Sequence, residues 1–324
     1  MTTASATEPT IGVFYEHPEW FEPMFAELDR RGVRYDRLLA HEHCFDPTER
    51  SSPYALVLNR MSPSAFRRGH ARAIPYTLEY LAHLEAVGAD VLNGYRAYRY
   101  EFSKTRQLGM LSRLGVRAPR ARVVQHAGQA VGAARALRYP LVIKPNVGGS
   151  GAGIRRFDDE AELRDAVEEG DLALGLDGVA LMQEYHRPAG GRITRVEVLG
   201  GRLLYAIELR LESPDSFDLC PADYCRVPAE GTPDGTAAVE PLARGVTPPR
   251  HVVETVLRIA EAAGMEVGGV EYLVSERDGA TYYYDVNALS NFVANAPDVV
   301  GFDPFTTLVD FVLERAGLLR YGRG

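Results

Sequence analysis

The sequence contains few cysteines and no long apolar segment. Its three cysteines are Cys44, Cys220 and Cys225, an odd number that does not suit a disulfide-stabilised secreted scaffold. No apolar run approaches the ~20 residues that a membrane-spanning helix requires. We therefore expect reduced thiols in a cytoplasmic protein that has no membrane partner.

Positive charge is also scarce, since the formal net charge is -8 over 324 residues. Nucleic acids and anionic membranes bind surfaces with an excess of Lys and Arg. We therefore expect no nucleic-acid partner. Residues 1–10 have neither the basic nor the apolar region of a signal peptide, and they predict a disordered leader.

Residues 11–101 alternate short apolar runs with stretches of helical periodicity. Such alternation is typical of a parallel sheet with helices packed against it. The strands are predicted at 11–15, 33–39, 54–59 and 89–93, and the helices at 19–31 and 71–87. This segment is predicted to form an N-terminal open parallel α/β domain.

Two further domains are predicted after it. Residues 102–183 mix helices and strands in the manner of a small α+β lid domain. Residues 184–324 contain two hairpins, with turns at 200–201 and 277–279, and predict an antiparallel-sheet domain. Within it, residues 213–249 are rich in Pro, Gly and Asp, which predicts a long irregular segment.

The strongest local motif is a lysine at the end of a predicted strand, followed by a glycine-rich loop. Lys144 ends the strand, and the loop glycines are Gly148, Gly149, Gly151 and Gly153. Glycine permits positive φ and close backbone approach, so consecutive N–H groups can converge on phosphate oxygens. The spacing matches neither a Walker A loop nor a Rossmann fingerprint. A phosphate-binding loop and an ordinary surface loop both remain open at this point.

Oxygen donors lie in the second predicted hairpin. Glu271 is on its first strand, and Asp285 and Asn287 are two residues apart on its second, so these two share one face. Two carboxylates and an amide oxygen suit Mg²⁺. The alternative is a solvated acidic strand edge. The strand is otherwise apolar and aromatic, however, and buried polar groups need partners.

A third feature is an acidic residue at the end of an apolar strand. Residues 180–184 predict the strand, and Gln183, Glu184 and Tyr185 lead from it into a loop. Backbone groups and Glu184 could read an adenine edge at this hinge. An ordinary strand end is the alternative.

In their order along the chain, these features resemble the ATP-grasp superfamily, in particular the branch of the ribosomal-protein-S6 glutamate ligase and glutathione synthetase. The resemblance extends from Ile11 to about Leu313. It implies the ATP-grasp fold, with an N-terminal open parallel α/β domain, a small lid domain and a C-terminal antiparallel-sheet domain.

The resemblance also implies roles for individual residues. Lys104 and Lys144 look like the two lysines that contact ATP phosphates, and residues 148–153, Ser150 included, look like the loop that covers them. Gln183, Glu184 and Tyr185 look like the adenine hinge. The implied magnesium ligands are Glu271, Asp285 and Asn287. The basic residues implied to face the phosphate and the acyl phosphate are Arg195 and Arg210.

The implied activity is ATP-dependent carboxylate–amine ligation through an acyl phosphate, with release of ADP and phosphate. The implied cofactors are ATP and Mg²⁺, with two ions expected and Mn²⁺ as a substitute. Small-molecule or peptide carboxylates and amines are the expected substrates, and a homodimer is a family-level expectation. Lysines, an arginine and metal ions would offset the charge that builds on phosphoryl oxygens.

The sequence departs from the family pattern at three places. Ile193 stands where relatives often carry the acidic ribose ligand, and Glu197 is out of phase with that position. Residues 288–292 replace a Ser-Pro-Gly turn that commonly helps to hold the acceptor. Residues 216–226 do not match the corresponding segment of the S6 ligase, although Arg226 is a candidate for its basic residue.

These departures leave two alternatives open. One is a non-catalytic ATP-binding or regulatory module, and the other is a kinase or acyl-phosphate hydrolase without an amine acceptor. Substrate contacts are expected beyond the carboxyl ends of the first domain's strands, where Arg60 and Ser62 lie. Cys220 and Cys225 are interpreted as structural thiols, because a zinc site would need two further ligands.

Overall fold

The computed structural model describes residues 10–149, 151–211 and 243–318. The chain divides into two compact units, one of Met1–Tyr98 with Asp303–Gly324 and one of Arg99–Phe302. Helix α3 (Tyr95–Glu101) runs from the first unit into the second. Among the described residues, no helix combines the length and the apolar character needed to span a bilayer.

The first unit is built on a parallel sheet with the strand order β2-β1-β3-β4. Its strands are β1 (Ile11–Tyr15), β2 (Tyr35–Leu39), β3 (Leu56–Arg60) and β4 (Val91–Leu92). Strands β1 and β3 are buried along their whole length, as expected for central strands of a sheet covered on both faces. This confirms the predicted open α/β arrangement.

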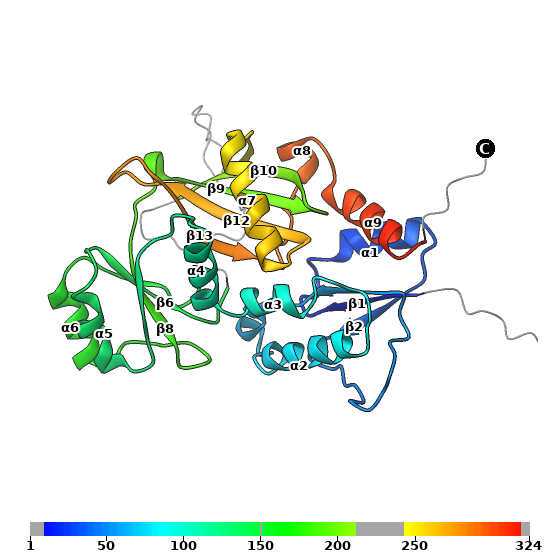
Figure 1. The fold of residues 1–324 in the computed structure, drawn as a ribbon, viewed down its shortest axis with the longest axis horizontal. Helices are drawn as coiled ribbons and strands as arrows, with labels where there is room; N and C mark the ends of the chain where they lie inside the picture. Colours follow the sequence, from blue (N-terminus) through cyan, green and yellow to red (C-terminus); the bar gives the residue numbers. More distant parts are fainter. Residues whose placement is uncertain (1–9, 150, 212–242, 319–324) are drawn as a thin grey trace, which may run out of the picture. The chain divides into compact units, whose positions relative to one another are not determined.

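Helices cover both faces of this parallel sheet (Figure 1). Helix α1 (Glu22–Arg30) packs against α9 (Pro304–Arg315) on one face, and α2 (Ala73–Ala86) lies on the other. The sequence grouped α9 with residues 184–324, whereas the structure packs it with the first unit. The division at 11–101, 102–183 and 184–324 otherwise stays a prediction.

The second unit contains two antiparallel sheets, of which the first has the order β5-β8-β6-β7. Its strands are β5 (Ala121–Val124), β6 (Leu141–Pro145), β7 (Arg155–Phe157) and β8 (Ala180–Glu184). Helices α5 (Ala130–Ala134) and α6 (Glu160–Glu168) complete its core. The sequence of residues 129–137 predicts a single helix, but the observed α5 is shorter. A 3₁₀ turn precedes it, and Gly132 lowers the helix propensity of so short a segment.

The second antiparallel sheet has the order β11-β10-β9-β12-β13. Its strands are β9 (Arg192–Leu199), β10 (Arg202–Arg210), β11 (Ala243–Gly245), β12 (Val267–Val274) and β13 (Thr281–Asn287). Both predicted hairpins are confirmed. The irregular segment predicted at 213–249 is wrong for 243–245, which forms β11, and its residues 213–242 lie outside the described ranges.

Three helices pack on this sheet in the second unit. Helix α7 (Arg250–Ala263) buries an apolar stripe against β9, β10 and β12. Helix α4 (Lys104–Arg113) packs against β13 and α7, and α8 (Ala296–Val300) packs against β10 and β11. Ser103 accepts a hydrogen bond from the Arg106 N–H and so caps α4, as serine commonly does directly before a helix.

A buried ion pair lies on β9, the middle strand of this sheet, beside a glycine of β12. The Arg195 Nε lies 2.6 Å from Glu197 Oε1, and both side chains are buried. Strand register places Gly269 between Glu197 and Asn287. A Cβ atom at Gly269 would lie 2.8 Å from Glu197 Oε1 and 2.9 Å from Arg195 Nε. Glycine at this position therefore makes the room that the ion pair occupies.

We predict that Gly269→Ala destabilises the fold by roughly 1–3 kcal/mol, because the added methyl group must displace a buried charged pair. Chemical denaturation of the whole chain measures this loss. Gly132→Ala is the matched control, since its Cβ would meet open space in α5 and alanine favours the helix. Equal stability of Gly269→Ala and the unaltered chain would contradict the crowding.

Candidate functional site

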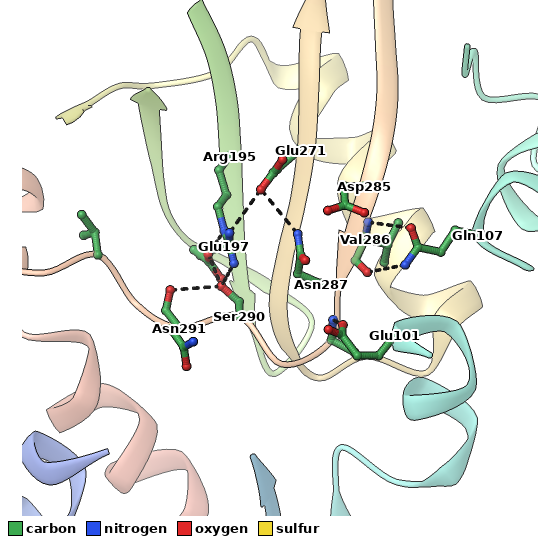
Figure 2. Close-up of polar contacts among 12 residues, drawn as sticks. Glu101, Gln107, Arg195, Glu197, Glu271, Asp285, Val286, Asn287, Ser290 and Asn291 are labelled. Atoms are coloured by element: carbon green, nitrogen blue, oxygen red, sulfur yellow. Dashed lines mark hydrogen bonds and ion pairs between the residues drawn. The ribbon is translucent and has the colours of Figure 1, made fainter. Parts of the chain in front are cut away.

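Three oxygen-bearing side chains lie together on neighbouring strands (Figure 2). Glu271 pairs with Asp285, and Gly269 pairs with Asn287, so the sequence-predicted ligands occupy two adjacent cross-strand rows. The Asn287 Nδ2 lies 3.5 Å from Glu271 Oε1. Glu271 is buried and the Asp285 side chain is 16% exposed. This donor set fits Mg²⁺, because an oxygen-preferring dication would neutralise two adjacent carboxylates.

Two lysines meet at Asp285. Lys104, the first residue of α4, forms an ion pair with it, and the Lys144 Nζ lies 3.8 Å from Asp285 Oδ1. The side chains of Lys104 and Lys144 are only 12% and 10% exposed. They are also the only two lysines in the sequence. All the other residues in its count of Lys and Arg are arginines. The structure thus brings together the two lysines that the sequence singled out.

Burial and charge oppose one another in this cluster. Burial alone would raise the pKa of Asp285, but Lys104 and Lys144 outweigh it and hold that pKa well below its ordinary value. Burial lowers the pKa of Lys144 to about 8, against the opposing effect of Asp285. Two ammonium groups are thus concentrated where little water reaches them, and each would be stabilised by a bound anion.

Arg195 contacts one of the candidate metal ligands, Glu271. Its Nη1 donates to Glu271 Oε1 at 3.2 Å, and its other nitrogens contact Glu197 and Ser290. Burial would lower the pKa of Arg195, but Glu197 and Glu271 raise it, so the guanidinium stays charged. Arg195 therefore orients Glu271 through a direct hydrogen bond. A contact between Arg195 and a phosphate stays a prediction.

The second predicted catalytic arginine is placed elsewhere on the sheet. Arg210 pairs with Arg192 near the ends of β10 and β9, whereas Arg195 pairs with Ile207. Because side chains alternate between faces, this register puts Arg210 on the face opposite to Arg195. The structure does not bring the two arginines together, and a catalytic role of Arg210 stays a prediction.

The glycine-rich loop follows β6, which ends at Pro145, one residue after Lys144. Gly151 and Gly153 adopt φ of 66° and 76°, and a Cβ at Gly153 would lie 2.9 Å from Pro145 Cγ. The loop conformation therefore depends on glycine at this position. Ser150 lies outside the described residues. Phosphate contacts from Gly148, Gly149 and the other loop residues stay a prediction.

The predicted hinge at the end of β8 is held by arginines. Glu184 is buried, and its carboxylate oxygens lie 3.6 Å from Arg120 Nη1 and 3.7 Å from Arg277 Nη1. The N–H groups of Glu184 and Tyr185 donate to backbone carbonyls. The Glu184 carboxylate thus fixes the strand end. Adenine contacts, including those of Gln183 and Tyr185, stay a prediction.

Two further polar residues shape the site and were not assigned a role from the sequence. Asn146 Oδ1 accepts hydrogen bonds from Ser103 Oγ and the Thr105 N–H, each at 3.0 Å, and so ties the start of α4 to the end of β6. Glu101 accepts from the Ala288 N–H at 2.6 Å. Glu101 and Asn146 lie close in sequence to Lys104 and Lys144, respectively. This closeness is the one feature of the sequence that could have pointed to their roles.

The first unit carries its own polar cluster at the carboxyl edge of the parallel sheet. Glu16 follows β1 and is buried, with Arg68 Nε at 2.9 and 3.0 Å from its oxygens and His70 Nδ1 at 2.5 Å. Arg60 ends β3 and is buried, and Ser62 caps a 3₁₀ turn. Ligands of open parallel sheets bind at this edge. The sequence singled out Arg60 and Ser62 but missed Glu16.

Comparison with known proteins identifies relatives of this arrangement. A family model described as the carbamoyl-phosphate synthase L chain, ATP binding domain, matches residues 104–179. A probable alpha-L-glutamate ligase of Citrobacter koseri is 29% identical over 209 residues, which are 62% of this chain. The match spans 61% of the length of that relative.

Solved structures share the fold over nearly the whole chain. The ATP-grasp ligase PsnB in complex with its minimal precursor aligns with a TM-score of 0.65 and 17% identity, over 95% of this chain and 100% of that one. The D-alanine–D-alanine ligase of Bacillus anthracis in complex with ATP aligns with a TM-score of 0.65 and 17% identity, over 98% and 100% of the two chains. These alignments show that the chain has the ATP-grasp fold, and residues 104–179 match the ATP-binding family model.

Proposed function

We propose that the chain is an ATP-dependent carboxylate–amine ligase that forms an amide through an acyl phosphate. The observation that carries this proposal is the meeting of Lys104 and Lys144 at Asp285, beside Glu271 and Asn287. Two ammonium groups and three oxygen ligands on rigid elements suit a polyphosphate and its magnesium. The relatives that carry the name ligase support the same activity.

The cationic residues are proposed to bind phosphate, and the oxygen-bearing residues are proposed to bind the metal. Lys104 and Lys144 would exchange their carboxylate partner for phosphate oxygens, because both ions are anionic and phosphate presents more acceptors. Glu271, Asp285 and Asn287 would hold Mg²⁺, which when bound offsets negative charge on the phosphoryl oxygens. Arg195 orients Glu271 by donating a hydrogen bond to its Oε1. No side chain needs to act as a covalent nucleophile.

The proposed reaction conserves atoms and charge in two steps. A substrate carboxylate oxygen attacks the γ-phosphorus of ATP, the bond to the β–γ bridging oxygen breaks, and ADP leaves. The amine nitrogen then attacks the acyl carbon, the carbon–oxygen bond to phosphate breaks, and the amine loses a proton. Exclusion of water by the loop that follows β6 would protect the acyl phosphate from hydrolysis.

The carboxylate and amine are proposed to be small molecules or a peptide terminus or side chain. A related structure holds a precursor, and a sequence relative is a probable alpha-L-glutamate ligase, so peptide and amino-acid substrates are the first classes to supply. The Glu16–Arg68 pair at the carboxyl edge of the parallel sheet, in which Glu16 is buried and Arg68 is partly exposed, is a candidate contact for a charged group.

We predict that ADP forms only when both a carboxylate and an amine are supplied with MgATP. The measurement is ADP release across pools of amino acids and short peptides, given singly and in pairs, with mass spectrometry of the product. A condensed product of matching mass identifies the substrates. ADP release at an unchanged rate without any amine would instead establish a kinase or acyl-phosphate hydrolase, and MgATP binding with no turnover in any pool would favour a binding module.

We predict that Lys144→Met weakens MgATP binding at least tenfold, about 1.4 kcal/mol, because a phosphate would lose a buried charged partner. Thermal stability should be retained or rise, since burial disfavours the charged form of Lys144 and Lys104 still pairs with Asp285. Calorimetric titration with MgATP and a thermal melt measure the two quantities.

Arg135→Met is the matched control, because it removes an exposed cation from the same sheet domain. It should change neither MgATP affinity nor the melting temperature. Unchanged MgATP affinity in Lys144→Met would remove Lys144 from the phosphate site.

A further inference from the structure

One side chain completes the hydrogen bonding of an edge strand. Strand β13 is the last strand of its sheet, so its outer N–H and C=O groups have no neighbouring strand in that sheet. The Gln107 Nε2 donates to the Val286 carbonyl at 2.8 Å, and the Val286 N–H donates to Gln107 Oε1 at 3.2 Å (Figure 2). This is the pair of hydrogen bonds that a strand residue would make. The second Nε2 proton goes to the Tyr100 carbonyl at 2.9 Å.

The segment just before α4 makes one further hydrogen bond to this edge. Glu101 accepts from the N–H of Ala288, two residues beyond Val286. On the other side, the Tyr283 N–H donates to the Arg117 carbonyl at 2.9 Å. Three successive outward positions of β13 and its extension are thus satisfied by the segment around α4. The candidate ligands Asp285 and Asn287 lie between these fixed points.

The Gln107 contact also sets the register of α4 on β13. Residues i and i+3 of a helix share one face, so Lys104 lies one turn before Gln107 on the side that meets the strand. Because Gln107 is fastened to Val286, Lys104 reaches the preceding strand residue, Asp285. Asn146 holds the first turn of α4 to the end of the strand that carries Lys144. Helix α4 is therefore fixed at both of its first two turns.

We propose that Gln107 is a positioning residue, whose amide fixes α4 and the Asp285–Asn287 segment to one another and so aligns Lys104 with the metal and phosphate site. The proposal rests on the proposed function for its consequence in catalysis. Its structural part, the dependence of Lys104 on Gln107, can be tested without nucleotide.

The chemistry of the amide explains why this position needs glutamine. Gln107 is buried, and it supplies one acceptor and two donors that are all used. An apolar residue of the same length would leave the Val286 groups buried without a partner, and each such group costs free energy. Strand β13 and α4 would then be free to shift relative to one another.

The first test uses the scarcity of lysine. The chain contains two lysines, so a protein labelled with ¹³C at lysine Cε gives two side-chain signals, which Lys104→Arg and Lys144→Arg assign. We predict that Gln107→Met moves the Lys104 signal and leaves the Lys144 signal nearly in place. Gln107→Asn, which keeps an amide but shortens its reach, is the second variant if Gln107→Met does not fold.

Two controls separate positioning from general loss of stability. Gln129→Met makes the same chemical change at an exposed site. Thr77→Val removes a buried hydrogen bond, from Thr77 Oγ1 to the Ala73 carbonyl, in the other unit. Both variants should leave the two lysine signals unchanged, even where Thr77→Val lowers the melting temperature.

The second test is a double-mutant cycle on MgATP affinity. Gln107→Met should raise the Kd roughly tenfold in the unaltered chain and by much less in a Lys104→Ala background, because Gln107 acts through Lys104. An unmoved Lys104 signal, or equal effects in both backgrounds, would overturn the proposal. A moved Lys104 signal in a chain with no measurable MgATP affinity would instead keep the positioning role and refute the proposed function.

Discussion

The central interaction of the second unit is the ion pairing of one carboxylate, Asp285, with two ammonium groups. Asp285 is mostly enclosed, and an isolated charge there would be costly, so it requires the cations that face it. Those cations come from two different structural elements, since Lys104 begins α4 and Lys144 lies in β6. The ion pairs thus require α4, strand β6 of the first antiparallel sheet and the β12–β13 hairpin to meet at one point. The same concentration of charge is what a polyphosphate would use.

A second layer of buried charge supports the first. Arg195 and Glu197 lie next to Glu271 and are enclosed by the sheet, with Ser290 as a further partner. Removing one member of such a set would leave a buried charge uncompensated, so the members depend on one another. Gly269 is the small residue that this layer needs. The residues that orient the site therefore matter as much as those that would touch a ligand.

The sequence was sufficient to predict both hairpins and to single out the two lysines and the three oxygen-bearing residues that the structure brings together. Strong periodicity and turn residues placed both hairpins, and the lysines and oxygen ligands stood in motifs whose order is specific. It was not sufficient for Gln107, Asn146 or Glu101, because their roles depend on contacts between residues far apart in the sequence. Strand β11 was missed for a similar reason, since three residues pair there only because β10 offers an edge.

The separation of the two predicted arginines illustrates what spacing alone leaves open. Arg195 and Arg210 both lie in one hairpin, and only the strand register shows that they belong to opposite faces. Local patterns identify the residue types that chemistry needs. Which of them share a face is set by pairing between strands.

The side chains on the outer edge of β13 also limit how a substrate could approach. An extended peptide can bind a protein by joining an open sheet edge as an added strand. Along β13 the N–H of Tyr283 already donates to Arg117, and the N–H and C=O of Val286 are already bonded to Gln107. An extended peptide therefore could not pair with β13 at these two positions without displacing Arg117 or Gln107.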